Sequence, residues 1–216
     1  LIETNQVKNV LLLTADTYSK FLHPDDKSVR SIFGDGATAT LIKSTSEPLL
    51  KGGICRPLLG TDGSGAKHLM IERGLKNSSK EADRYLRMNG SEILAFTLKN
   101  IPKLVSNTLN AHNMTHEDID LFIFHQANAF MLDTLRKKIN IPHEKFFLYL
   151  ESVGNTVSST IPIAIKEAGK SGKLNNAKKV MLVGFGVGLS WGSVIVDLSL
   201  FKCTNCLTPD LKISYE

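Results

Sequence analysis

The segment Lys178–Leu198, KKVMLVGFGVGLSWGSVIVDL, joins two apolar runs through a glycine-rich connection. A weaker copy of this pattern starts at Lys8, where KNVLLLTAD is followed by FGDGATATLIK, which ends at Lys43. Short continuous apolar runs such as Asn9–Ala15 are typical of strands that are buried on both faces. Self-similarity between distant segments indicates a duplicated unit. The two copies therefore predict two related halves.

Strands and helices alternate along the sequence that precedes the second copy. Helices are expected at 94–109, 128–139 and 158–168, and strands at 121–124 and 146–150. This alternation predicts an α/β fold with a largely parallel sheet. About three strand–helix units precede the second copy, and none precedes the first. We therefore expect 1–48 to be the tail of an incomplete N-terminal half, 49–202 a whole C-terminal half, and 203–216 a tail.

The composition is that of an ordinary globular protein, with 216 residues, 42% of them hydrophobic and 22% charged. No apolar run reaches the roughly 20 residues that cross a bilayer, so no membrane span is expected. The net charge of +5 is scattered, which argues against nucleic-acid binding; it suits a phosphorylated partner or an ordinary solvated surface. Three cysteines are too few for a disulfide framework, which favours a reducing, cytoplasmic compartment.

Two polar residues come at or shortly after the ends of predicted strands. His125 comes immediately after 121–124, and Asn155 follows the next predicted strand. The carboxyl ends of parallel strands meet at one edge of a sheet, where α/β folds place their sites. The two side chains are therefore expected to converge over one cleft. The alternatives are a core histidine with satisfied hydrogen bonds and a turn asparagine beside Gly154.

Glycines recur in GFGVG, at Gly184, Gly186 and Gly188. Glycine allows a backbone to approach an oxyanion closely, although a tight turn between strands is the alternative. A strand rather than a helix follows, which excludes a dinucleotide fingerprint. Cys203 and Cys206 form a C-x-x-C with no second pair, so no metal site is predicted. Cys55 and these two cysteines all lack the strand-to-helix position of an activated nucleophile.

Together, FGDGA, HQAN, GNTVSSTIP and GFGVGLSWGS resemble, in order and spacing, the second part of a β-ketoacyl-[acyl-carrier-protein] synthase III of the thiolase superfamily. The resemblance extends to about Leu200. It implies a thiolase-like fold of mixed, mostly parallel sheets with layered helices, and a homodimer with a Cys–His–Asn site. It also implies condensation of an acyl-CoA primer with malonyl-acyl carrier protein to start fatty acid biosynthesis, with no cofactor besides these substrates.

The resemblance assigns roles to single residues of this sequence. His125 and Asn155 would promote decarboxylation of the malonyl group and stabilise the enolate, and the backbone N–H of Val187 would belong to the oxyanion hole. The residues implied in substrate binding are Lys27, Gly90 and Asn128. Lys27 stands where many members have Arg, and it keeps the charge without the planar fork.

Two departures from the family leave alternatives open. Phe130 stands where many members carry a basic residue for the carrier protein. The family's nucleophilic Cys is expected before Leu1, so this chain is expected to be inactive alone. The alternatives are a synthase III-like acyltransferase of a specialised pathway and a non-catalytic thiolase-fold partner.

Overall fold

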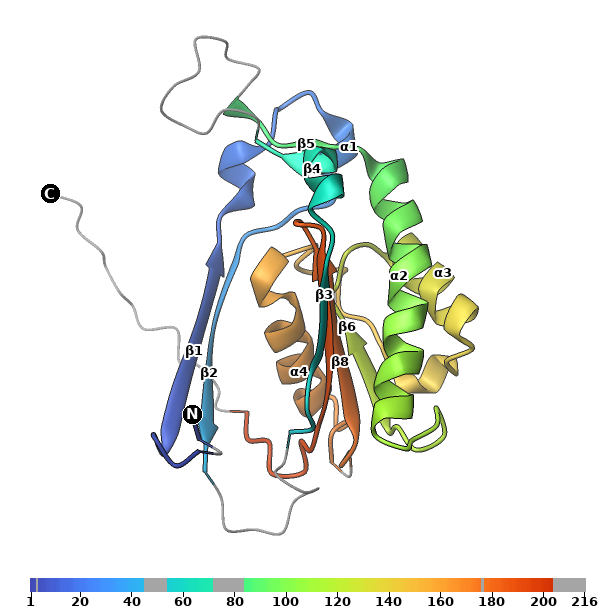
Figure 1. Cartoon of the computed structure of the whole chain (residues 1–216). Coiled ribbons are helices and arrows are strands. Elements are labelled where there is room, and N and C mark those ends of the chain that lie inside the picture. The colour runs from blue at the N-terminus through green and yellow to red at the C-terminus, as the bar shows by residue number, and fades with distance from the viewer. Residues whose placement is uncertain (3, 45–53, 72–83, 176, 204–216) are drawn as a thin grey trace, which may run out of the picture.

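The computed structural model describes residues 1–203 apart from 3, 45–53, 72–83 and 176 (Figure 1). Most of the predicted tail, including Cys206, lies outside the described residues, as does the predicted boundary at 48/49. The described elements are β1 (Asn9–Asp16), η1 (Tyr18–Phe21), α1 (Lys27–Arg30), β2 (Gly36–Lys43), β3 (Leu58–Thr61), η2 (Gly63–His68), β4 (Leu69–Met70), β5 (Arg87–Met88), α2 (Gly90–Ala111), β6 (Leu121–Phe124), α3 (Ala129–Ile139), η4 (His143–Lys145), β7 (Phe146–Phe147), η5 (Val157–Ser159), α4 (Thr160–Lys170), β8 (Val180–Gly186) and β9 (Ser190–Val196), where η marks a 3-10 helix.

A five-stranded sheet with the order β3-β9-β8-β6-β7 forms the centre of the molecule. β6 pairs in parallel with β7 and β8, whereas β9 pairs antiparallel with β8 and β3. Four strands therefore run in one direction and β9 runs against them, which confirms the mixed, mostly parallel sheet. β7 is shorter than the strand expected at 146–150.

The elements stack in layers that alternate between helix and sheet (Figure 1). α2 and α3 cover one face of the five-stranded sheet, and α4 covers the other. α4 also contacts β2, so it lies between this sheet and the antiparallel pair of β1 and β2. The pair β1–β2 has the same antiparallel arrangement as β8–β9, which agrees with the repeat in the sequence.

The core explains why these segments fold as they do. All four residues of β6 are buried because helices cover both faces of this strand. α2 buries a stripe that includes Ile101, Leu104 and Val105 against the sheet. No helix in the described part of the chain is long and apolar enough to cross a bilayer.

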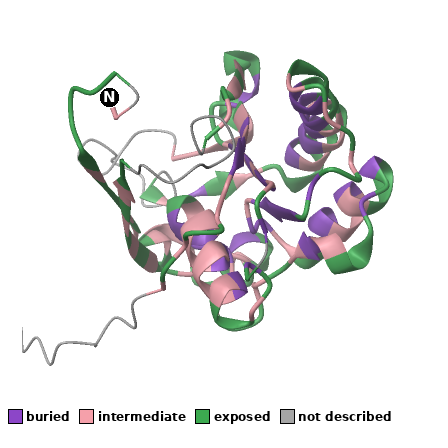
Figure 2. Ribbon diagram, turned by 90° about the horizontal axis from the view of Figure 1, so that it is seen from below, coloured by how far each residue is buried: buried purple, intermediate pink, exposed green. Residues whose placement is uncertain are grey.

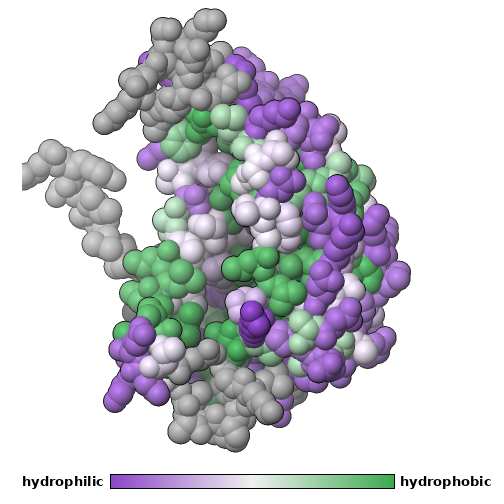
Figure 3. Space-filling model, viewed as in Figure 1, coloured by the Kyte–Doolittle hydropathy of each residue, from purple (hydrophilic) through white to green (hydrophobic). Residues whose placement is uncertain are grey.

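Burial of β1 on both faces was expected, and this prediction is wrong for the described residues. Leu11 and Leu13 are 60% and 67% exposed, and Leu41, the cross-strand partner of Leu11, is 58% exposed. α4 and η5 cover only the inner face of this pair, where Thr14 points. The outer face is visible in Figure 2 as exposed ribbon and in Figure 3 as a hydrophobic area over β1 and β2.

The glycine-rich connection is also shorter than expected. β8 continues to Gly186 and β9 begins at Ser190, so that Gly184 pairs with Gly192. Only residues 187–189 remain between the strands. Backbone pairing extends the hairpin through the glycines, and the connection therefore holds Val187 at the tip of β8 and β9.

Candidate active site

His125 directly follows Phe124, the last residue of β6. Its backbone N–H donates to the carbonyl of Val183 in β8 at 2.7 Å. Its ring lies edge-on to Phe185, with ring centroids 5.4 Å apart and planes at 88°. Nδ1 lies 2.7 Å from Oγ1 of Thr160. The ring is therefore held by two neighbouring elements, β8 and α4.

The environment keeps this imidazole neutral. His125 as a residue is partly buried, and desolvation by the protein around it lowers its pKa from 6.5 to about 4. At neutral pH the ring therefore carries no charge.

Asn155 is held by its backbone and by its side chain. Its N–H donates to Ile32 and its carbonyl accepts from Gly34, each at 2.9 Å, in an isolated bridge to the segment before β2. Oδ1 accepts the N–H of Val157 at 2.9 Å, and the residue is 6% exposed. Because Oδ1 is engaged in this way, the amide nitrogen is the group that Asn155 has left to offer.

The short segment 155–160 connects the two candidate residues. Asn155 begins it, and Thr160, the partner of the His125 ring, is its last residue. Between them Val157 has a φ of 55°, which is unusual for a β-branched residue. Asn155 and the Thr160 contact of the His125 ring therefore lie on one short segment.

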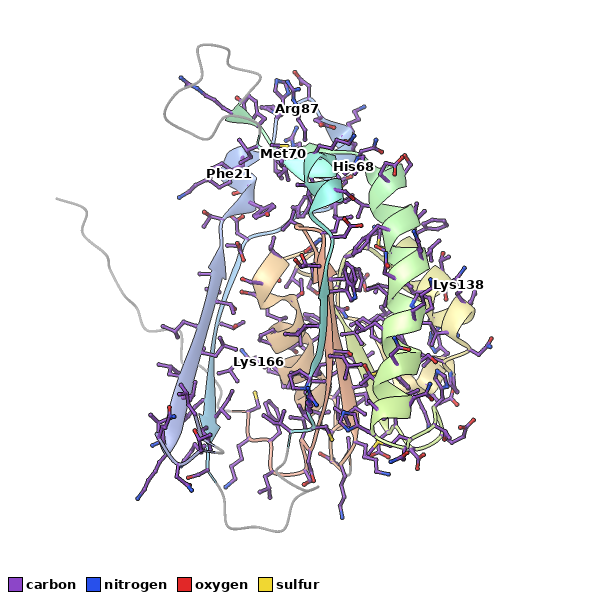
Figure 4. All side chains as sticks on the ribbon, in the orientation of Figure 1. Phe21, His68, Met70, Arg87, Lys138 and Lys166 are labelled. Carbon is purple, nitrogen blue, oxygen red and sulfur yellow. The ribbon has the colours of Figure 1, made fainter. Side chains whose placement is uncertain are left out.

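Val187 lies two residues beyond Phe185, beside an open apolar hollow of about 300 Å³. Figure 4 labels two of its lining residues, Phe21 and Met70, near the upper end of the molecule. The hollow is lined by Tyr18, Phe21, Leu69, Met70, Ile71, Leu86 and Val187. The sequence analysis did not anticipate this lining, which combines segments that are far apart in the chain.

The three residues implied in substrate binding occupy starts of helices. Lys27 is exposed in the first position of α1, and Gly90 is exposed in the first position of α2. A Cβ at Gly90 would meet nothing within 4 Å, so packing does not require glycine there. Asn128 caps α3 by accepting the N–H of Met131 at 2.8 Å. Among the described residues, none of the three forms a hydrogen bond with His125 or Asn155.

Two further residues shape the site and were missed from the sequence. Gln126, 1% exposed, donates to the carbonyls of Phe124 and Phe147 and accepts from the N–H of Tyr149, and so ties the segment after β6 to β7. Thr160 binds the His125 ring. The only signal for Thr160 was a hydroxyl residue at the start of a helix, five positions after Asn155.

The described cysteines lie away from His125. Cys55 donates its N–H to the carbonyl of Ile195 in β9, on the edge of β9 that also pairs with β3. In the strand order, β9 and β8 therefore lie between Cys55 and β6. Burial raises the pKa of the Cys55 thiol, which disfavours a thiolate. Cys203 lies beside Gly169, nine residues along α4 from Thr160. Within the described part of the chain, no three His, Cys, Asp or Glu side chains cluster in a way that could hold a metal ion.

Comparison with protein families gives two matches, one in the N-terminal and one in the C-terminal part of the chain. The family model for 3-oxoacyl-[acyl-carrier-protein (ACP)] synthase III matches residues 1–63. The model for the C-terminal part of the same family matches residues 109–198. The second match contains both His125 and Asn155.

Individual relatives agree with these models. The chain is 38% identical over 204 residues to a beta-ketoacyl-[acyl-carrier-protein] synthase III of Clostridium perfringens, covering 92% of this chain and 62% of the relative. Among solved structures, a 3-oxoacyl-(acyl-carrier-protein) synthase III superposes with a TM-score of 0.85 and 44% identity, over 90% of this chain and 62% of that one. The Thermus thermophilus enzyme superposes with a TM-score of 0.80 and 31% identity, over 91% and 61%.

The chain thus spans about 62% of the length of the Clostridium perfringens relative. The C-terminal match includes β6, His125 and Asn155, and the superposition covers 90% of this chain. On these grounds the chain belongs to the 3-oxoacyl-[acyl-carrier-protein] synthase III family.

Proposed function

We propose that this chain carries the His–Asn part of a 3-oxoacyl-[acyl-carrier-protein] synthase III, an acyltransferase that starts fatty acid biosynthesis. The observation that carries the proposal is that the His125 ring contacts Thr160, five residues after Asn155, and Phe185, two residues before Val187. Family membership supplies the reaction class, because the relatives are named as synthases that act with acyl carrier protein.

The proposed reaction is a decarboxylative Claisen condensation. The bond between the α-carbon and the carboxylate of malonyl-acyl carrier protein breaks, carbon dioxide leaves, and the electron pair stays on the thioester as an enolate. The enolate carbon then forms a bond with the carbonyl carbon of an enzyme-bound acyl thioester, whose carbon–sulfur bond breaks to release a thiolate. Donors that face the developing oxyanions lower the barrier, each by a few kcal/mol in a dry site.

Residues of this chain can supply such donors. The Asn155 amide nitrogen is free of the turn because Oδ1 is the atom that accepts from Val157. The backbone N–H of Val187 belongs to the three-residue connection at the tip of β8 and β9. His125 contributes a neutral ring, since burial keeps its pKa at about 4. These three groups form the proposed catalytic set.

The nucleophilic thiol is proposed to come from outside the described residues. Cys55 lies beyond two strands from β6, and its raised pKa suits packing rather than attack. Cys203 lies near the far end of α4. We therefore propose that neither Cys55 nor Cys203 is the nucleophile.

Substrates and partners follow from the same proposal. The apolar hollow beside Val187 fits the hydrocarbon part of an acyl primer. Lys27 and Asn128 are proposed to contact coenzyme A or the carrier's phosphopantetheine, with Gly90 beside them. We also propose a homodimer that uses no further cofactor and works in the cytoplasm, in keeping with a sequence of 216 residues that has only three cysteines.

The test uses the full-length protein that contains this chain, supplied with acetyl-CoA and malonyl-acyl carrier protein. Formation of acetoacetyl-acyl carrier protein, and its loss by 10²-fold or more in His125→Ala and Asn155→Ala, would support the proposal. His112→Ala is the matched control, because His112 caps the C-terminal end of α2, where its ring contacts the carbonyl of Arg56, and the variant should leave the rate unchanged. Turnover with a different acceptor only would favour a specialised acyltransferase, and no turnover with any acyl-CoA would favour a non-catalytic partner.

A further inference from the structure

The connection 187–189 is held from the side of β3. Backbone pairing between β3 and β9 ends with Thr61 opposite Ser190. One further pair continues this ladder: the N–H of Asp62 donates to the carbonyl of Leu189 at 2.7 Å, and the N–H of Leu189 donates to the carbonyl of Asp62 at 2.8 Å. The Thr61 hydroxyl also donates to the Leu189 carbonyl, at 3.1 Å. The segment that leads from β3 into η2 therefore engages both backbone groups of Leu189 (Figure 1).

The side chain of Leu189 lies against a glycine of η2. Leu189 is 5% exposed and belongs to the main apolar core. A Cβ on Gly65 would lie 2.4 Å from Cδ1 and 2.6 Å from Cγ of Leu189, far closer than two carbon atoms can approach. A Cβ on Gly63, two positions earlier in the same helix, would meet nothing within 4 Å. Residue 65 can therefore carry a side chain only if Leu189 moves.

Alternation along β8 indicates which way the backbone of Val187 faces. The carbonyl of Val183 accepts from the N–H of His125 and so points toward β6, whereas Gly186 pairs with Ser190 of β9. Successive residues of a strand direct their backbone groups to opposite edges. This alternation directs the N–H of Val187, the next residue, to the edge of β8 where His125 lies. Within the described part of the chain, that N–H donates to no backbone carbonyl.

We propose that Gly65 is a positioning residue for the oxyanion donor. The lack of a side chain at Gly65 lets Leu189 pack against η2, and this packing fixes the connection that carries the Val187 N–H. Only one residue separates Val187 from Leu189, so a displacement of Leu189 changes the direction of that N–H. The inference rests on the function proposed above, because a donor lowers the barrier when its direction is set before the reaction.

The first test exchanges steric bulk between the two positions in the full-length protein that contains this chain. Gly65→Ala should lower kcat for condensation by about 10-fold or more, with KM for malonyl-acyl carrier protein unchanged, because the new Cβ displaces Leu189 and with it the donor. Leu189→Ala in the same molecule removes the atoms that this Cβ would meet, and should restore most of the rate. Gly63→Ala is the matched control, since it makes the same change in the same helix into open space and should leave kcat unchanged.

The double variant separates positioning from damage to the fold. Each rate is measured well below the unfolding temperature of its variant, so that a loss of stability alone does not change it. A normal rate in Gly65→Ala would overturn the proposal. Equal losses in Gly65→Ala and in the double variant would also overturn it, because relief of the contact with Leu189 would then have no effect on the donor.

A second measurement needs no substrate and so stands apart from the proposed reaction. Carbon-13 in glycine carbonyls and nitrogen-15 in valine select the amide of Val187, because Gly186–Val187 is the only Gly–Val pair in the 216 residues. Val187→Ala confirms the assignment of this NMR signal in the full-length protein.

The signal of the Val187 amide should shift in Gly65→Ala, return most of the way when Leu189→Ala is added, and stay in place in Gly63→Ala. An unmoved signal in Gly65→Ala would contradict the proposal even if the protein catalyses condensation. A shift that Leu189→Ala reverses, in a protein that does not condense malonyl-acyl carrier protein, would support the positioning by Gly65 and count against the proposed reaction alone.

Discussion

Asp16, the last residue of β1, accepts two hydrogen bonds from Ser158, one from its backbone N–H at 3.1 Å and one from its hydroxyl. The two residues are 142 positions apart in the sequence. This contact joins the first copy of the repeat to the turn that carries Asn155 and leads to Thr160.

Removal of the Asp16 carboxylate should lower the stability of the folded chain. We expect Asp16→Ala to lower the free energy of unfolding by about 1–2 kcal/mol, because two charge-assisted hydrogen bonds between distant elements are lost. Urea denaturation measures the change. Asp62→Ala is the control, since Asp62 makes the same pair of bonds to Ser64 only two residues away. Equal losses in the two variants would show that the long-range contact adds nothing.

The lowered pKa of His125 makes stability depend on pH. The unfolded chain binds a proton at this residue below about pH 6.5, and the folded chain only near pH 4. Stability from this residue is therefore complete above pH 6.5 and is lost as the pH falls toward 4, by up to about 3 kcal/mol. His125→Gln should flatten the curve of unfolding free energy against pH in this window. Parallel curves for His125→Gln and the unmodified chain would contradict the pKa.

Gly154 should tolerate no side chain. Its φ is +64°, and a Cβ would lie 2.9 Å from the carbonyl oxygen of Ile32. We expect Gly154→Ala to cost about 1–3 kcal/mol and to displace Asn155. Gly90→Ala is the comparison, because a Cβ there meets open space at the start of a helix, and it should be neutral or stabilising by up to about 1 kcal/mol. The unfolding temperatures of the two variants measure these changes, and equal temperatures would contradict the prediction.

Asn128 has a structural role that can be separated from the proposed contact with substrate. Asn128→Ala should lose about 1 kcal/mol of stability with the N-cap, and Asn128→Asp should keep the cap because aspartate accepts the same N–H. The amide donor is absent in both variants. A raised KM for malonyl-acyl carrier protein in Asn128→Asp, at unchanged stability, would support a contact with the substrate. An unchanged KM would assign Asn128 to the cap alone.

Much of the fold could be predicted because it depends on local pattern. The apolar run of β6, the amphipathic stripe of α2 and the alternation of strands with helices are visible in residues that are neighbours in the chain. The strand end before His125 could be found in the same way, whereas the strand before Asn155 ends at Phe147, earlier than predicted. Pattern could not show that β1 has an exposed face, because burial depends on which distant element packs against each side of a strand.

By itself, the sequence determined the α/β class, the repeat and the strand end before His125, since periodicity and turn chemistry are properties of short segments. Only the tertiary structure decided that Thr160 lies against Nδ1 of His125 and that Val157 faces both Asn155 and Thr160. These relationships join β6, η5 and α4 and are held by β1. The charge and orientation of a histidine ring depend on the atoms around it, and chain folding rather than residue order brings those atoms together.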